Sequence, residues 1–66
     1  MSRYEICEWI IPGVLKEVVS HEDNIDDVKT SLSAIKDVKQ LARGELFKKY
    51  TVVDMLTGNT DLEVFQ

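Results

Sequence analysis

The central segment of the chain carries apolar side chains three and four residues apart, the spacing of one helical face. The six positions are Ile25, Val28, Leu32, Ile35, Val38 and Ala42. Asn24, just before them, is a favoured N-cap residue, and the acids that follow it fall in the first turn, where the helix dipole favours anions. We therefore expect a helix from Ile25 that either ends at Gly44 or continues through it to about Lys49.

Two strand-like segments precede this helix. RYEICEWI and VLKEVVSH are rich in aromatic and β-branched residues, and the Pro-Gly pair at 12–13 between them is a turn signal. A loop of even length would pair Ile10 with Leu15, Trp9 with Lys16, Glu8 with Glu17, Cys7 with Val18 and Ile6 with Val19. A loop of odd length would change these pairs and the face on which each side chain lies.

The last segment, YTVVDMLTGNTDLEVF, predicts a second hairpin around Thr-Gly-Asn. A two-residue turn at 58–59 pairs Met55 with Leu62 and Val53 with Val64, whereas a four-residue loop pairs Val53 with Leu62. The order of elements is then strand, strand, helix, strand, strand. We expect one α+β domain over residues 1–66, a ββαββ arrangement in which one central helix packs on one face of an antiparallel sheet.

Both hairpins have apolar residues on two faces, and one helix covers only one of them. We expect the second face to bind a partner, because monomers rarely expose a large contiguous apolar patch without a use. The predicted apolar partner-binding residues are Cys7, Trp9, Ile11, Val18, Tyr50, Val52 and Phe65. Asp54 and Glu63 are predicted to meet basic groups of that partner.

Three arrangements would cover the second face. The hairpins could curl so that both faces meet the core, two copies could form a symmetric homodimer, or a different protein could bind there. A chain of 66 residues gains from any of these, because a domain of that size buries only about 60% of its unfolded surface.

The net charge of −4 disfavours direct nucleic-acid binding, which needs basic groups to replace the counterions of the phosphates. The single cysteine, Cys7, excludes an internal disulfide and fits a reducing, cytoplasmic location. No signal peptide is recognisable at the start of the sequence, and the longest apolar run, WIIPGVL, is too short to span a membrane.

No residue pattern in the sequence predicts catalysis, a cofactor or a metal. Cys7 and His21 are predicted on opposite faces, so a small apolar role for the thiol is favoured over a nucleophile. The acids around His21 lack the spacing of a metal motif, and helix capping explains them. Lys29, Lys36 and Arg43 recur every seven residues along one helix flank, which would suit phosphates but favours a solvated face in an acidic chain. We expect a non-enzymatic protein.

A short acidic chain that begins with a strand, has one central helix and ends in VVDMLTGNTDLEVF resembles the small accessory proteins of bacteriophages and mobile elements. The resemblance implies a protein that binds a host or defence protein and inhibits or otherwise modulates it, and it implies no particular site residue. The alternatives from the sequence are an acidic nucleic-acid mimic and a homodimeric structural subunit.

Overall fold

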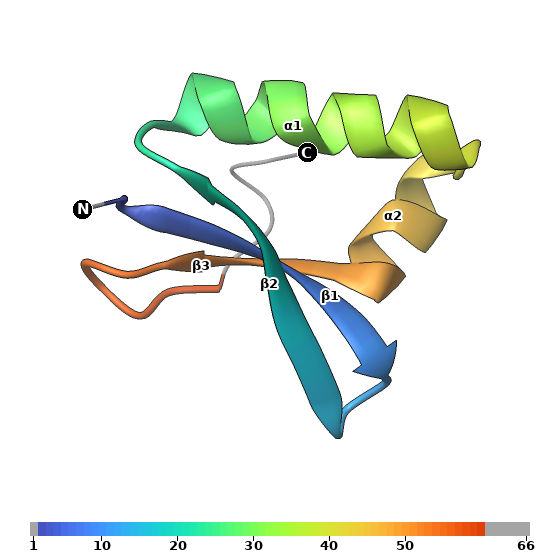
Figure 1. Ribbon diagram of the computed structural model, residues 1–66, viewed down its shortest axis with the longest axis horizontal. Coiled ribbons are helices and arrows are strands. Elements are labelled where there is room, and N and C mark those ends of the chain that lie inside the picture. The colour runs from blue at the N-terminus through green and yellow to red at the C-terminus, as the bar shows by residue number, and fades with distance from the viewer. Residues whose placement is uncertain (1, 61–66) are drawn as a thin grey trace.

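The computed structural model describes residues 2–60 of the chain, and within them three strands and two helices form one α+β unit. The elements are β1 (Tyr4–Ile11), β2 (Leu15–Glu22), α1 (Ile25–Lys39), α2 (Arg43–Lys49) and β3 (Tyr50–Asp54). The sheet is antiparallel with the order β2-β1-β3, and α1 lies across one of its faces (Figure 1). The predicted α+β class is confirmed, with a second helix added before the third strand.

Helix α1 begins where the sequence predicts. The Asn24 side chain accepts a hydrogen bond from the backbone N–H of Asp27 at 3.0 Å, which satisfies one of the N–H groups that a helix start leaves unpaired. The helix ends at Gln40 in a left-handed conformation, with φ 54°. The Leu41 N–H then bonds to the Lys36 carbonyl at 3.0 Å, closing the last turn.

The predictions for the end of this helix were therefore wrong. The chain leaves α1 at Gln40 rather than at Gly44, and it does not continue as one helix. Gly44 instead lies in the first turn of α2, a short helix that runs directly into β3 at Tyr50. Leu46 of this second helix is buried in the core.

The first hairpin has much of its predicted register. Trp9 pairs with Lys16, Glu8 with Glu17 and Cys7 with Val18, as predicted for an even-length loop. The loop itself is odd, with the three residues 12–14, so the predicted pair of Ile10 with Leu15 is wrong and the other pairs form because Ile10 is an extra residue in β1. The pairing shifts between Ile6 and Cys7, so that Ile6 lies opposite Ser20 rather than Val19. A second shift, between Trp9 and Ile11, places Ile11 opposite Leu15. Each irregularity adds one residue to one strand, which bends the hairpin and increases its twist.

The core lies between the sheet and the two helices. Its buried side chains are Tyr4, Ile6, Val28, Leu32, Leu46, Tyr50 and Val52, and Ile25, Ile35, Leu41 and Phe47 pack against them. Val38 was predicted on the same apolar stripe as Val28, but it is 83% exposed. The helix therefore meets the sheet over a narrower face than the sequence pattern suggests.

The predicted placement of Tyr50 and Val52 on the uncovered face was wrong. Tyr50 lies opposite Glu8 and Val52 opposite Ile6, so both side chains point to the helices and are buried. The alternation of β3 is fixed by α2, which ends at the residue before Tyr50 and has Leu46 in the core. Val53, the residue after Val52 in the strand, takes the other face.

After β3 the chain reverses direction. The Gly58 N–H bonds to the Asp54 carbonyl at 2.6 Å, the Asp54 N–H bonds to the Asn59 carbonyl at 2.9 Å, and Gly58 has φ 74°. The fourth strand predicted after this turn, with Leu62, Glu63, Val64 and Phe65, lies outside the described residues.

Candidate protein-binding surface

The β1–β2 hairpin extends beyond the rest of the sheet. Pairing between β1 and β3 ends at Glu8 and Tyr50, whereas β1 and β2 continue to the turn after Ile11. We call residues 9–16 the hairpin arm. In Figure 1 the arm points away from α1, and no described element packs against its end. The arm overhangs the sheet because β1 and β2 have 8 residues each, whereas β3 has only 5.

The surface of the arm is apolar. Within residues 2–60, six of the nine exposed large apolar side chains belong to the arm or to its base. They are Ile10, Ile11, Val14 and Leu15 in the arm and Val18 and Val19 at its base. Val14 is the most exposed of the six, at 77%. Such a concentration of apolar surface in one projecting element is typical of a binding surface.

A well-formed turn holds the end of the arm. The Val14 N–H bonds to the Ile11 carbonyl at 2.9 Å, and Gly13 has φ 74°. Pro12 has its own φ fixed by its ring, as the second residue of this turn requires, and Gly13 adopts a positive φ without steric cost. The Pro-Gly signal in the sequence therefore predicted this turn, and the flanking apolar residues are presented on a defined backbone.

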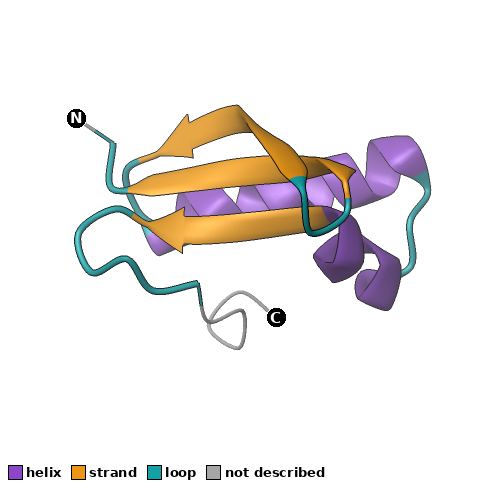
Figure 2. Cartoon of the chain, turned by 90° about the horizontal axis from the view of Figure 1, so that it is seen from below, coloured by secondary structure: helices purple, strands orange, loops and turns teal. Residues whose placement is uncertain are grey.

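The face of the sheet opposite the helices continues this surface toward β3. Figure 2 shows that neither helix passes in front of the three strands on this side. Trp9 is half-buried there, and its indole N–H donates to the Thr51 hydroxyl at 2.7 Å. The Lys16 ammonium lies 5.3 Å from the centre of the Trp9 ring, a cation–π contact. Trp9 is thus a fixed part of the surface with one ring face under a lysine.

Cys7 lies on the same face but cannot be a contact residue, because only 2% of it is exposed. Burial raises the pKa of its thiol, so the thiol stays protonated at neutral pH. His21 was predicted on the face opposite Cys7, and that prediction was wrong. The shift in register places His21 opposite Glu5, on the same face as Cys7. The Nδ1 atom of His21 lies 3.8 Å from Glu5 Oε2.

Asp54 is occupied within the chain rather than presented to a basic partner. Arg3 donates to both of its carboxylate oxygens, at 3.2 and 3.0 Å, and the Leu56 N–H adds a bond at 3.0 Å. The hydrogen bonds from Arg3 are the main reason that the pKa of Asp54 falls to about 2. The other predicted acid, Glu63, and the predicted aromatic residue, Phe65, lie outside the described residues.

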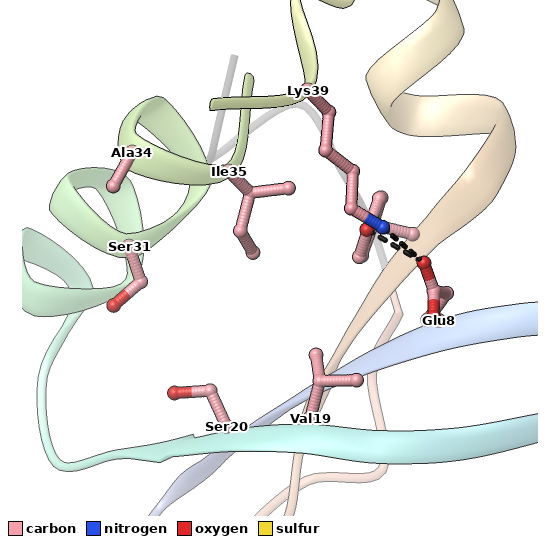
Figure 3. Close-up of a pocket in the computed structure, with 8 residues that line it drawn as sticks. Glu8, Val19, Ser20, Ser31, Ala34, Ile35 and Lys39 are labelled. Carbon is pink, nitrogen blue, oxygen red and sulfur yellow. Dashed lines mark hydrogen bonds and ion pairs between the residues drawn. The ribbon is translucent and has the colours of Figure 1, made fainter. Parts of the chain in front are cut away.

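A cavity of about 400 Å³ opens between α1 and the base of the arm. Figure 3 shows Val19 and Ser20 of β2 facing Ser31, Ala34 and Ile35 of α1 across it. The lining is mainly apolar, and Val19 belongs both to this cavity and to the exposed apolar surface. The cavity is therefore a place where an apolar side chain of a partner could enter.

Glu8, Lys39 and Tyr50 lie at one end of this cavity. The Lys39 ammonium and the Tyr50 hydroxyl each donate to Glu8 Oε2 at 2.7 Å, as the dashed lines in Figure 3 indicate for the lysine. These hydrogen bonds, that of Lys39 first, lower the pKa of Glu8. At the other end, the hydroxyls of Ser20 and Ser31 both donate to Glu22, which ties β2 to α1. The charged groups here are engaged in holding the two layers together.

The part of the surface that the sequence missed is the end of the arm. The even-length pairing predicts Ile10, Leu15 and Val19 on the face that the helix covers. It predicts Val14 on the second face, but Val14 is not among the predicted partner-binding residues. The available signal was the unequal length of the strands, since a long first hairpin must overhang a short third strand.

Comparisons with known proteins do not narrow this picture: no protein-family model, no curated protein and no solved structure matches the chain. Neither α1 nor α2 is long and apolar enough to cross a membrane. Within residues 2–60, no group of three or more His, Cys, Asp and Glu side chains is arranged to hold a metal ion.

Proposed function

We propose that this chain is a non-enzymatic interaction module that binds a partner protein through the hairpin arm and the adjoining open face of the sheet. The observation that carries the proposal is the gathering of six exposed apolar side chains on one hairpin. Burying them against a partner would release about 25 cal/mol for each Å² of apolar surface removed from water.

The form of the arm supports a specific contact. Val14 and Leu15 project from a backbone held by the turn, so little conformational entropy is lost when they are bound. Trp9 supplies a large aromatic surface of the type enriched in binding hot spots, and its bond to Thr51 holds the ring in place before binding. The phage-type resemblance agrees with a small module of this kind, with an inhibited or modulated host protein as the partner.

The test is affinity capture from the lysate of the source organism with two matched baits. One bait carries Val14→Ser and Leu15→Ser in the arm, and the control carries Met55→Ser and Leu56→Ser after β3. All four side chains are at least half exposed, so neither bait should lose its fold. The arm variant should lose a protein that the wild type and the control retain, and that protein should bind the purified chain. Equal retention by both baits would refute the proposal.

One observation favours a second candidate, a homodimer formed along β2. In the described sheet β2 is an edge strand, and Val18 and Val19 at its middle are both exposed. An exposed apolar edge can pair with the same edge of a second copy. Light scattering on a size-exclusion column, over a dilution series, separates the two candidates. A dimer that persists at low micromolar concentration would favour self-association, and a monomer would leave the surface for another protein.

A further inference from the structure

A groove between α1 and α2 lies on the helical side of the molecule, away from the hairpin arm. Its volume is about 290 Å³. Lys29, Leu32 and Lys36 line it from α1, and Arg43, Leu46 and Phe47 line it from α2. The break at Gln40 creates this groove, because it turns α2 back beside α1. The three basic residues, seven apart in the sequence, are thereby brought to one site.

The basic side chains of this groove form no ion pair with any acid among residues 2–60. The ion pairs of the described residues join Arg3 to Asp54, Lys39 to Glu8 and His21 to Glu5, and none includes Lys29, Lys36 or Arg43. Three of the eight Lys and Arg residues thus gather in one groove, without an ion pair to any other described residue, in a chain whose net charge is −4. A local excess of positive charge in an acidic protein attracts an anionic group.

The shape of the groove indicates what kind of anion fits. Lys29 and Lys36 are two helical turns apart, which places them about 10 Å from each other along α1. A single phosphate would leave the apolar part of the groove without a partner. The floor is apolar, because Leu32 and Leu46 are buried and Phe47 is half-buried. The groove therefore suits an extended ligand with several negative charges and an aliphatic group.

We propose that the α1–α2 groove binds a short acidic segment of a protein. Its carboxylates would pair with Lys29, Lys36 and Arg43, and an aliphatic side chain between them would pack against Phe47. A peptide is favoured over a nucleic-acid strand, because a strand continues past the groove along a surface whose overall charge is negative. This site is separate from the hairpin arm and does not depend on the function proposed for the arm.

The test uses a fluorescein-labelled peptide of Glu-Glu-Leu repeats and fluorescence anisotropy at low ionic strength. The groove variant is Lys36→Glu with Arg43→Glu. The matched control is Lys48→Glu with Lys49→Glu, which makes the same change in net charge on exposed lysines outside the groove. The groove variant should bind the peptide at least about tenfold more weakly than wild type, and the control less than about threefold more weakly. Added salt should weaken the wild-type complex.

Two further measurements keep the proposal open to refutation if a variant unfolds. In the wild-type protein, amide NMR shifts on adding the peptide should concentrate in α1 and α2 around the groove, and a Lys-Lys-Leu peptide should cause none there. The arm variant Val14→Ser with Leu15→Ser should bind the peptide as wild type does. Equal weakening in the groove and control variants would overturn the proposal. So would shifts spread over the sheet, or tighter binding of a single-stranded oligonucleotide or of inorganic phosphate.

Discussion

Two valines of α1 provide the sharpest test of the packing. Val28 and Val38 belong to the same apolar pattern in the sequence, yet Val28 is 0% exposed and Val38 is 83% exposed. Changing each to alanine removes the same atoms from the same helix. The two substitutions should therefore differ only through their surroundings.

The expected magnitudes follow from burial. Val28→Ala removes two methyl groups from a closed core, at about 0.8 kcal/mol each, and leaves a cavity, so the loss should be about 2–3 kcal/mol. A chain of this size is stable by only about 3–10 kcal/mol, so this loss is a large share. Val38→Ala removes no packing, and the better helix propensity of alanine should stabilise the protein by about 0.5 kcal/mol.

Urea denaturation followed by circular dichroism measures both effects. With a slope near 1 kcal/mol per M, the midpoint for Val28→Ala should fall by about 2–3 M, and the midpoint for Val38→Ala should stay level or rise slightly. Similar losses for the two variants would refute the placement of α1 on the sheet. A loss for Val38→Ala alone would mean that the helix is rotated about its axis.

Three further predictions concern single residues. The lowered pKa of Asp54 contributes stability that is complete above its ordinary 3.8 and is lost as the pH falls through about 2, so Asp54→Asn should flatten this part of the pH dependence of the urea midpoint. Gln40→Gly should raise the free energy of unfolding by up to about 1 kcal/mol, because glycine adopts the left-handed conformation without strain; a loss would contradict the observed end of α1. The buried Cys7 thiol should react slowly with Ellman's reagent in the native protein and rapidly in urea, and equally fast reaction in both would show that β1 is open.

The features predicted well from the sequence are those with local causes. The cap at Asn24 depends on residues within one helical turn, and the reversal between β1 and β2 depends on the Pro-Gly pair of one tight turn. The helix, the first hairpin and the α+β class follow from such signals, because each can be read within a window of about ten residues.

The features predicted wrongly depend on distant packing. Gln40 adopts a conformation in which glycine is the usual residue, so nothing in its identity marks the end of α1. The inward direction of Tyr50 and Val52 is set by α2, which the sequence did not separate from α1. An extra residue in a β-bulge, as beside Ile6, has no sequence marker either. The predicted partner-binding residues were therefore only partly correct. Ile11 and Val18 are exposed as expected, whereas Cys7, Tyr50 and Val52 are buried.

The measurement that most directly tests the central claim is photo-crosslinking from a single exposed position. A benzophenone amino acid is placed at Val14 in the arm or at Leu56 after β3, which are 77% and 75% exposed. In the lysate of the source organism, the arm position should form a covalent adduct with one other protein, and position 56 should not. Adducts from position 56 alone, or adducts from the arm only to a second copy of the chain, would contradict the assignment of the arm as the surface that binds another protein.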